Sequence, residues 1–333
     1  MTDAPIKDAS AAHWVYRLPQ PARAFAQLSR LDRPVGYWLL ALPGWIGLAF
    51  ASLSHGFAVG DLKWAALILI GAIAMRGAGC TYNDIVDQDL DAKVERTALR
   101  PLPAGTVTTK QAWIWLLAQC AVGLIVLFCL PRLAQIVSLA SIPLVAAYPF
   151  MKRITWWPQV WLGLTFNWAV LVAYAAKTGA VSPALFVYAG LIFWTVGYDT
   201  IYACQDIEDD AIIGVKSTAR RFGGKIKPIV AACYMIFTAC IYIAFFFEPF
   251  ANVSVVEFLF MEQENLRLLY PLSIFLIILP AVISIISIVL KFDPSDTELC
   301  LKLFKNNFWV AILIIAGLYT WPVIMGLIAA SLP

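Results

Sequence analysis

The sequence predicts an all-α, polytopic membrane protein with nine transmembrane helices. Hydrophobic residues make up 61% of its 333 residues and charged residues only 14%, whereas soluble domains are about 45–50% apolar and about 25% charged. Several uncharged runs also approach the roughly 20 residues that a helix needs to cross a hydrocarbon core of about 30 Å. This composition excludes a soluble globule, a disordered chain and a nucleic-acid-binding protein, because each of those needs more charge.

Apolar runs between breaking residues define the nine expected spans. Their ranges are 34–54, 62–83, 111–130, 133–151, 159–176, 183–204, 228–247, 268–290 and 308–331. Residues 1–33 are then expected to form a cytoplasmic N-terminal tail, and residues 34–331 a single transmembrane domain. We expect a solvated segment with a short interfacial helix in the long acidic loop at 248–265.

The basic residues predict how these spans are oriented. If the N-terminus is cytoplasmic, 19 of the 24 lysines and arginines fall in inside segments, four fall outside, and Arg76 alone lies within a span. Such a bias fixes orientation by the positive-inside rule. It also favours an odd number of spans, because removing one helix would mix basic with neutral loops.

The N-terminal residues predict the kind of membrane. No apolar stretch precedes Gly36, so we expect no secretory signal, and Asp3 and Asp8 argue against a mitochondrial presequence. A bacterial cytoplasmic membrane is therefore the expected location, with the N-terminus and the active site on the cytoplasmic side.

Neither the seven cysteines nor the two histidines predict a site. The sequence contains no C-x-x-C pair and no Cys/His spacing suited to zinc. Most cysteines lie in apolar runs, where a free thiol behaves as a small hydrophobic group. His13 and His55 lie in the tail and in a short loop, and we assign them no role.

A first acidic cluster lies at the cytoplasmic end of the second expected span, in residues 84–91. Asn83, Asp87 and Asp91 are spaced by four residues, which places them on one face of a helix. Carboxylates stacked in this way repel one another, and a bound cation would reverse the sign of that interaction.

A second acidic cluster, residues 206–210, lies at the cytoplasmic end of the sixth expected span. Asp199, Asp206 and Asp210 are spaced by seven and four residues, so they too share a helix face. The ligands in both clusters are hard oxygens, which suit Mg²⁺ or Mn²⁺ rather than zinc or copper. Two facing clusters could hold two Mg²⁺ ions bridged by a diphosphate.

Basic residues follow each acidic cluster and also end the fourth span. A solvated acidic loop is the usual meaning of such a charge run, but here both clusters keep one-face spacing at a membrane boundary. Lysines and arginines beside them would neutralise diphosphate oxygens that the metal ions leave bare. The basic residues are Lys93, Arg96, Arg100, Lys152, Arg153, Lys216, Arg220 and Arg221.

Four ordered motifs resemble the UbiA superfamily of intramembrane prenyltransferases. Residues 76–91, followed by Arg96-Thr97 and residues 100–102, resemble its first signature, and residues 198–218 resemble its second. Residues 32–36 and 148–153 are similar to further motifs of that superfamily. Together the matches extend from residue 32 to about residue 224.

This resemblance implies a helix bundle around a central cavity that opens to lipid, and Mg²⁺-dependent transfer of a polyprenyl chain from polyprenyl diphosphate to an aromatic acid. The motifs are most similar to those of members that prenylate 4-hydroxybenzoate in ubiquinone biosynthesis. Carried over by position, the implied metal ligands are Asn83, Asp84, Asp87, Asp91, Asp206 and Asp210. The implied substrate-binding residues are Arg76, Tyr148, Lys152, Arg153, Asp199, Tyr202 and Lys216. Of these, Asp87, Asp91, Asp206, Asp210, Lys152 and Arg153 are the expected catalytic residues.

Several alternatives remain open from the sequence. The acceptor could instead be a haem, a homogentisate, a naphthoate or a chlorophyllide, and a transporter with membrane-embedded acids is a hypothesis from another class. Arg76 could pair with Asp87 or line a polar cavity. Asn167 could bind substrate or link helices. The sequence does not predict the prenyl chain length or the oligomeric state.

Overall fold

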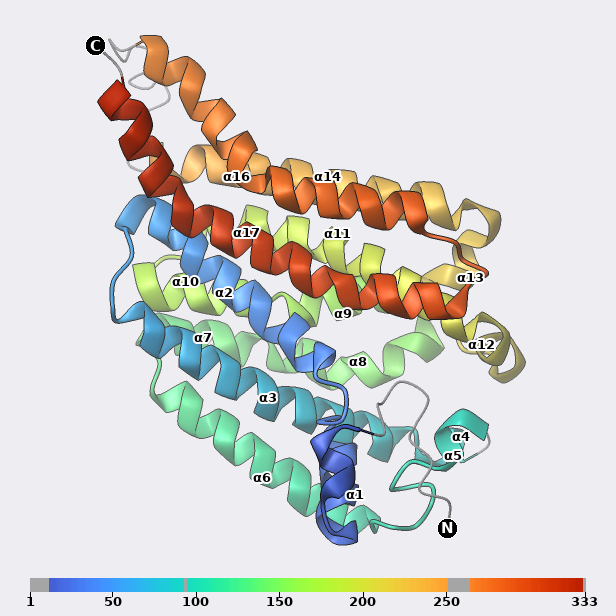
Figure 1. Cartoon of the computed structure of the whole chain (residues 1–333). Helices are drawn as coiled ribbons and strands as arrows, with labels where there is room; N and C mark the ends of the chain where they lie inside the picture. The colour runs from blue at the N-terminus through green and yellow to red at the C-terminus, as the bar shows by residue number, and fades with distance from the viewer. Residues whose placement is uncertain (1–11, 93–94, 251–263, 332–333) are drawn as a thin grey trace.

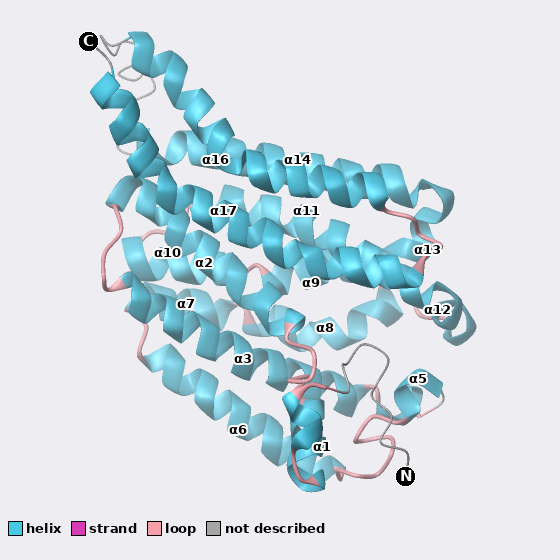
Figure 2. Ribbon diagram, in the orientation of Figure 1, coloured by secondary structure: helices cyan, strands magenta, loops and turns pink. Residues whose placement is uncertain are grey.

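The computed structural model describes residues 12–92, 95–250 and 264–331, and in these residues every regular element is helical (Figures 1 and 2). In the described residues, nine single helices or runs of consecutive helices are long and apolar enough to cross a membrane, as predicted. The nine spans are Val35–His55, Asp61–Val86, Thr109–Phe128, Arg132–Ile154, Pro158–Thr178, Ala184–Asp206, Thr218–Phe247, Leu269–Lys291 and Thr297–Met325.

Uninterrupted helices long enough to cross a membrane form most of the bundle. They are α2 (Val35–His55), α3 (Asp61–Val86), α6 (Thr109–Phe128), α11 (Ala184–Ala203), α14 (Ile226–Phe247), α16 (Glu264–Lys291) and α17 (Thr297–Ser331). Local signals fix their ends. At α6, for example, Gln111 N–H donates to the Thr108 hydroxyl at 3.3 Å, and the Gln111 side chain accepts from the Thr108 N–H at 2.9 Å. This reciprocal pair is a capping box.

Two spans are interrupted near their middles. The fourth consists of α7 (Arg132–Ala140) and α8 (Ile142–Ile154), and the fifth of α9 (Pro158–Phe166) and α10 (Ala169–Thr178). At the second break, the buried Asn167 side chain donates to the Gly163 carbonyl at 2.8 Å. The break therefore leaves less unsatisfied polar backbone in the apolar interior.

Short helices gather at one end of the bundle. They are η1 (Trp14–Arg17), α1 (Gln20–Leu28), α4 (Gln88–Asp91), α5 (Glu95–Ala98), η2 (Cys204–Asp206), α12 (Ile207–Ile213), α13 (Thr218–Phe222) and η3 (Gly223–Lys225). Figure 1 shows α1 lying across the ends of α3 and α6, with α4, α5, α12 and α13 at the same end. Residues 14–28, which the sequence analysis assigns to a tail, thus form helices packed on the bundle.

The main apolar core lies among α2, α10, α11, α14, α16 and α17. Two buried polar contacts tie three of these helices together: the Trp194 indole N–H and the Tyr234 hydroxyl donate to Asn307 Oδ1, at 2.8 and 2.9 Å. Helices α3, α6 and α7–α8 surround this core on one side. At the far end, η4 (Glu248–Phe250) follows α14, and the expected interfacial helix after it lies mostly outside the described residues.

Candidate active site

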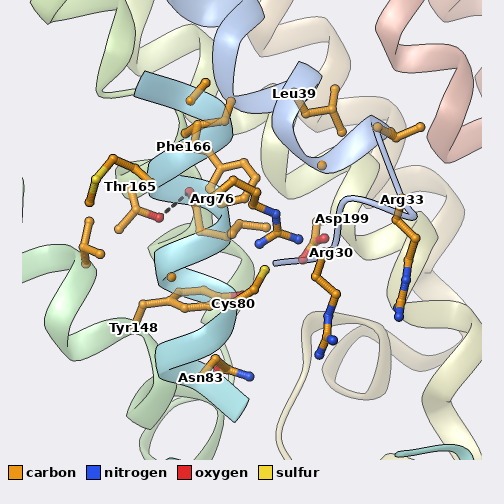
Figure 3. A pocket seen from close by; sticks show the side chains of 18 of the residues that line it. Arg30, Arg33, Leu39, Arg76, Cys80, Asn83, Tyr148, Thr165, Phe166 and Asp199 are labelled. Carbon is orange, nitrogen blue, oxygen red and sulfur yellow. Dashed lines mark hydrogen bonds between the residues drawn. The ribbon is translucent and has the colours of Figure 1, made fainter. Parts of the chain in front are cut away.

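A cavity of about 880 Å³ lies inside the bundle, lined by residues of α2, α3, α6 to α12, α17 and the segment before α2 (Figure 3). Along α3 the lining residues run from Leu67 to Asp84 on one face. At a rise of 1.5 Å per residue this face is about 26 Å long. The cavity is therefore deep enough to reach from the membrane boundary well into the apolar layer.

The two ends of the cavity differ in polarity. Residues of α3, α6 and α10 far from the short helices give apolar walls, while the end beside the short helices carries most of the charged groups. The apolar walls include Leu67, Ile68, Met75, Val126, Leu127 and Val172, and the charged end includes Asp84, Lys152, Asp199, Asp206, Asp210 and Lys216. Both acidic clusters thus contribute to one cavity, as the sequence predicts.

The first acidic cluster does not lie on one uninterrupted helix. Helix α3 ends at Val86 and α4 begins at Gln88. The Asp87 N–H still donates to the Asn83 carbonyl at 2.9 Å, and the Asp91 N–H donates to the Asp87 carbonyl at 2.8 Å. The three residues therefore stay one turn apart, but only Asn83 lines the cavity, and the buried Asp87 and Asp91 lie behind it.

Basic side chains neutralise both of these buried carboxylates. Asp87 forms ion pairs with Lys152 and with Arg153, the latter at 2.5 Å, and Asp91 pairs with Arg100 at 2.6 Å. Burial raises the pKa of the Asp91 carboxyl above its ordinary value, and the charge of Arg100 opposes that shift. A metal ion bound by Asp87 or Asp91 would have to replace one of these cations.

Asp84 joins the acidic cluster to two arginines. Its Oδ1 atom lies 2.6 Å from Arg30 Nη2 and 3.5 Å from Arg100 Nη1, and its side chain is fully buried. The other oxygen, Oδ2, is buried without a hydrogen-bond partner. Burial opposes the charge on Arg30, but Asp84 with the nearby Asp32 and Asp91 raises the pKa of Arg30 above its ordinary value.

The backbone of Arg30 is unusual. Among the described residues it is the one non-glycine residue with a positive φ, 55°. A left-handed conformation brings Cβ close to a carbonyl oxygen and costs about 1–2 kcal/mol. Such strain persists where the surrounding structure over-determines it, and it clusters at functional sites.

The second acidic cluster also differs from a continuous helix. Helix α11 ends at Ala203, the 3₁₀ helix η2 ends at Asp206, and α12 begins at Ile207. Asp199, Asp206 and Asp210 nevertheless all line the cavity, together with Tyr202. The interruption of the helix therefore does not separate the predicted acidic residues.

The predicted basic residues meet where two segments join. The Lys216 N–H donates to the Lys152 carbonyl, and Lys216 Nζ donates to the Ile154 carbonyl, both at 3.0 Å. These bonds attach the segment after α12 to the end of α8. Lys152 and Lys216 line the cavity, whereas Arg153 contacts Asp87 from outside it.

Arg76 lies deeper in the cavity than the other basic residues described above. Its guanidinium carbon is 5.2 Å from the centre of the Phe166 ring, a distance at which a cation is attracted to the ring face. Figure 3 shows the Arg76 guanidinium pointing toward Asp199. Tyr148, from α8, lies on the cavity wall at the level of Cys80. Asp87 is paired with Lys152 and Arg153, so Arg76 lines a polar cavity, the second of its two predicted possibilities.

Asn167 links helices. Its Nδ2 atom donates to the Leu191 carbonyl at 3.0 Å and to Thr195 Oγ1 at 2.7 Å, so it joins the break between α9 and α10 to α11. It is fully buried and is not among the lining residues. The structure therefore favours the linking role over substrate binding.

The donor set fits Mg²⁺ held partly by substrate. Within the described residues no three Asp, Glu, His or Cys side chains lie close enough together to hold a metal ion alone. Mg²⁺ usually takes one or two carboxylates and completes its octahedron with water and phosphate oxygens. Carboxylate and amide oxygens on two sides of one cavity, with a buried unpartnered oxygen on Asp84, suit that arrangement.

Sequence reasoning assigned no role to several residues that line the charged end. Arg30 and Lys305 lie outside both acidic clusters in sequence, and His13 lies in the predicted tail. Arg100 was expected to neutralise diphosphate oxygens, whereas the structure pairs it with Asp91 and Asp84. The one signal for Arg30 in the sequence was its position two residues before Asp32, where a motif similar to one of the superfamily begins.

Comparison with known proteins identifies similar chains. The UbiA prenyltransferase family matches residues 40–300. The 4-hydroxybenzoate geranyltransferase 2 of Lithospermum erythrorhizon is 37% identical over 317 residues, which cover 94% of this chain and 95% of that protein.

Mitochondrial 4-hydroxybenzoate polyprenyltransferases are also similar. The Arabidopsis thaliana protein is 44% identical over 225 residues, which cover 67% of this chain and 54% of that protein. The Homo sapiens protein is 47% identical over 221 residues, covering 66% of this chain and 59% of that protein. The matched part thus spans little more than half the length of these curated relatives.

Two solved structures share the fold. A UbiA homolog from Aeropyrum pernix in its apo form has a TM-score of 0.64 at 24% identity, covering 85% of this chain and 97% of that one. A UbiA homolog from Archaeoglobus fulgidus bound to GPP and Mg²⁺ has a TM-score of 0.61 at 19% identity, covering 90% of this chain and 99% of that one.

Proposed function

The chain belongs to the UbiA prenyltransferase family, and we propose that it transfers a polyprenyl chain from polyprenyl diphosphate to 4-hydroxybenzoate. The new bond forms at the ring carbon ortho to the hydroxyl, diphosphate is released, and the product serves ubiquinone biosynthesis. Relatives named as 4-hydroxybenzoate prenyltransferases support this acceptor. The alternative is the same donor chemistry with another acceptor, such as a haem, a homogentisate or a naphthoate.

The observation that carries the proposal is the meeting of two acidic clusters and several basic side chains at one end of an otherwise apolar cavity. We assign Asn83, Asp87 and Asp91 to one Mg²⁺ ion, and Asp206 and Asp210 to a second. When bound, Mg²⁺ would act as a Lewis acid toward the diphosphate oxygens.

The basic residues at this end would bind the diphosphate. Lys152 and Arg153 both neutralise Asp87, and Lys152 also lines the charged end of the cavity. We propose that they transfer to the diphosphate when Asp87 binds metal, with Lys216 and Tyr148 adding further donors. Positive groups fixed around a departing anion stabilise the charge that develops as its bond breaks.

The reaction balances with these residues alone and the substrates. The bond between the allylic carbon and the diphosphate oxygen breaks, and its electron pair leaves with the diphosphate. The ring carbon ortho to the phenol supplies the pair for the new bond, and its proton then passes to the released diphosphate, which restores the aromatic ring. The allylic cation has to be kept from water, which the apolar part of the cavity provides.

Arg76 is the residue we assign to the acceptor carboxylate. The Arg76 guanidinium lies on the cavity wall between the acidic end and the apolar end, over the ring of Phe166. We assign Asp199 to orienting this guanidinium, because Figure 3 shows the two side chains directed toward each other. Tyr202 lies on the same wall, one turn nearer the acidic end.

The prenyl chain would lie along the apolar walls. The lining face of α3 between Leu67 and Met75 has no charged residue and faces apolar residues of α6 such as Val126 and Leu127. An isoprenoid chain buried there would be stabilised by about 25 cal/mol for each Å² of apolar surface removed from water.

The protein is a multi-pass membrane protein, and we propose a bacterial cytoplasmic membrane with the active site on the cytoplasmic side. The basic bias of the segments at the end holding α1, α4 and α12 supports this orientation. Attaching a reporter enzyme that is active only in the cytoplasm to residue 333 or to the loop after α2 would test it.

The proposed function can be tested with an isosteric pair of substitutions in the first acidic cluster. Asp87→Asn should lower prenyl transfer by roughly 100-fold or more, because it removes a charge from the metal–diphosphate site. Asp89→Asn is the matched control, since Asp89 is exposed, whereas Asp87 is buried and paired with Lys152 and Arg153. Asp206→Asn should behave like Asp87→Asn.

The assay crosses these variants with a panel of acceptors and with removal of divalent cations by a chelator. We expect prenylated 4-hydroxybenzoate only with Mg²⁺ present. Full activity of Asp87→Asn or activity in excess chelator would refute the metal assignment. Prenylation of another acceptor in place of 4-hydroxybenzoate would contradict the acceptor assignment but would agree with the proposed diphosphate site.

A further inference from the structure

The turn that ends α1 has the hydrogen bonds of a helix terminus that normally carries glycine. The Leu31 N–H donates to the Ala26 carbonyl and the Arg30 N–H to the Gln27 carbonyl, both at 3.0 Å. This is the Schellman pattern, in which the residue after the C-cap adopts a left-handed conformation and is usually Gly. Here that position is occupied by Arg30, with a φ of 55°.

The backbone alone gives no reason for an arginine at this position. Gly populates positive φ without steric cost, so it would form the same turn with less strain. The strained arginine at this position therefore points to a task for its side chain that a glycine could not perform.

The side chain of Arg30 is buried and directed at the first acidic cluster. It is 8% exposed, and its Nη2 atom lies 2.6 Å from Asp84 Oδ1. Its other terminal nitrogen, Nη1, donates to the Gln27 carbonyl at 3.1 Å, within the turn itself. The left-handed backbone and this bond together aim the guanidinium at Asp84.

Asp84 is the point at which three segments meet. It lies on the last turn of α3, next to Asn83, and Arg100 approaches it from the loop before α6 at 3.5 Å. Arg100 also pairs with Asp91 at 2.6 Å. The turn after α1, the end of α3 and the loop at residue 100 are thus held by one buried network, and Arg30, Asp84 and Arg100 all line the cavity.

Neighbouring bonds anchor the same turn to α6. The Ser29 hydroxyl donates to Gln119 Oε1 at 3.0 Å, and the Trp115 indole N–H donates to Ser29 Oγ at 2.7 Å. Arg30 is therefore held on a fixed support rather than on a freely moving tail.

We propose that Arg30 is a positioning residue for the metal–diphosphate site: through Asp84 it holds the end of α3, and so keeps Asn83 and Asp87 in place to bind metal. This inference rests on the proposed function. It assigns Oδ1 of Asp84, which the sequence suggests as a metal ligand, to holding arginines. It also makes the segment from α1 to α2 part of the active site.

The test uses Arg30→Gly, which suits the turn and removes only the side chain, with Arg30→Lys as the conservative variant. Arg17→Ala is the control, because Arg17 lies in the same N-terminal segment, is exposed and does not line the cavity. Two measurements need no acceptor: amide hydrogen exchange of residues 80–92, and calorimetric titration of the full chain with Mg²⁺ and inorganic diphosphate.

We expect Arg30→Gly to fold with a lowered melting temperature, because relief of the left-handed strain only partly offsets the loss of the ion pair between Arg30 and the buried Asp84. Amide exchange at residues 83–87 should become faster. The concentration of Mg²⁺ needed for diphosphate binding should rise about tenfold, in line with the loss of a charge-assisted hydrogen bond. Arg30→Lys should recover part of this loss, and Arg17→Ala should show none of it.

Wild-type exchange and wild-type Mg²⁺ dependence in Arg30→Gly would overturn the proposal, since Arg30 would then serve only the turn. If Arg30→Gly does not fold, the Mg²⁺ dependence of Arg30→Lys decides: an unchanged value overturns the proposal and a raised value supports it. Failure of the wild-type chain to prenylate 4-hydroxybenzoate would overturn the acceptor assignment but would leave both of these measurements valid.

Discussion

Gly36 offers a way to move Arg76 without changing any charge. A Cβ atom added at Gly36 would lie 2.8 Å from Arg76 Nε and 3.1 Å from its Nη2, whereas ordinary contacts begin at 3.4 Å. Gly36→Ala would therefore displace the guanidinium by about 0.6 Å. The clashing atoms are at the end of a flexible side chain, so we expect little loss of stability.

The displacement should act on the acceptor. Misplacing a reacting or binding group by about 1 Å can cost about 100-fold in rate, and a shift of about half that size predicts roughly a tenfold rise in the KM for 4-hydroxybenzoate. The KM for the prenyl diphosphate should stay unchanged, because Arg76 is not assigned to the diphosphate.

The assay is steady-state kinetics in detergent or nanodiscs with each substrate varied in turn. Gly60→Ala is the matched control, since a Cβ there meets no atom within 4 Å and Gly60 does not line the cavity. An unchanged KM for the acceptor in Gly36→Ala would contradict the assignment of Arg76 to its carboxylate. An equal rise for both substrates would indicate a general disturbance of the site instead.

Three further predictions concern stability. Gly317→Ala would push a Cβ into the Ile277 carbonyl, and because this contact is with backbone we expect a loss of about 1–3 kcal/mol, measured by thermal unfolding. Lys177→Met would leave the buried Asp61 without the ion pair made at 2.5 Å, and losing one partner of such a pair costs about 3–5 kcal/mol; a melting temperature within a degree of wild type would contradict this. Burial raises the pKa of Glu248, just after α14, above its ordinary value. The folded state therefore binds this proton more tightly than the unfolded state, so stability falls as pH rises from the ordinary glutamate pKa to the raised one. Glu248→Gln should flatten this decline in melting temperature.

The sequence by itself determined the membrane fold and the composition of the site. Nine apolar runs of spanning length are sufficient to predict nine helical spans, because lipid offers no hydrogen bonds to an exposed backbone and a helix satisfies its own. The acidic clusters, at residues 84–91 and 206–210, were also predicted as a site, because carboxylates spaced by about one helical turn suit a hard metal ion. The structure brings Asn83 and Asp84 of the first cluster and Asp206 and Asp210 of the second to one cavity, whereas Asp87 and Asp91 do not line it.

Tertiary structure decided how those charges are partnered. Asp87 pairs with Lys152 and Arg153, more than 60 positions away in sequence, and Asp84 pairs with Arg30, 54 positions away. Helical periodicity relates residues within a few turns, so it is silent about contacts between segments that only the folded bundle brings together.

The same limit explains the differences in detail. The breaks at Asp87 and near Asp206 were not predicted, because helix ends at these points depend on ion pairs and backbone contacts from other segments. The linking role of Asn167 follows only from its hydrogen bond to the Leu191 carbonyl of α11, which the sequence does not predict. The role of Arg30 required a backbone angle, which no residue pattern records: its left-handed turn is set by how α1 packs on α3 and α6, and that packing exists only in the folded chain.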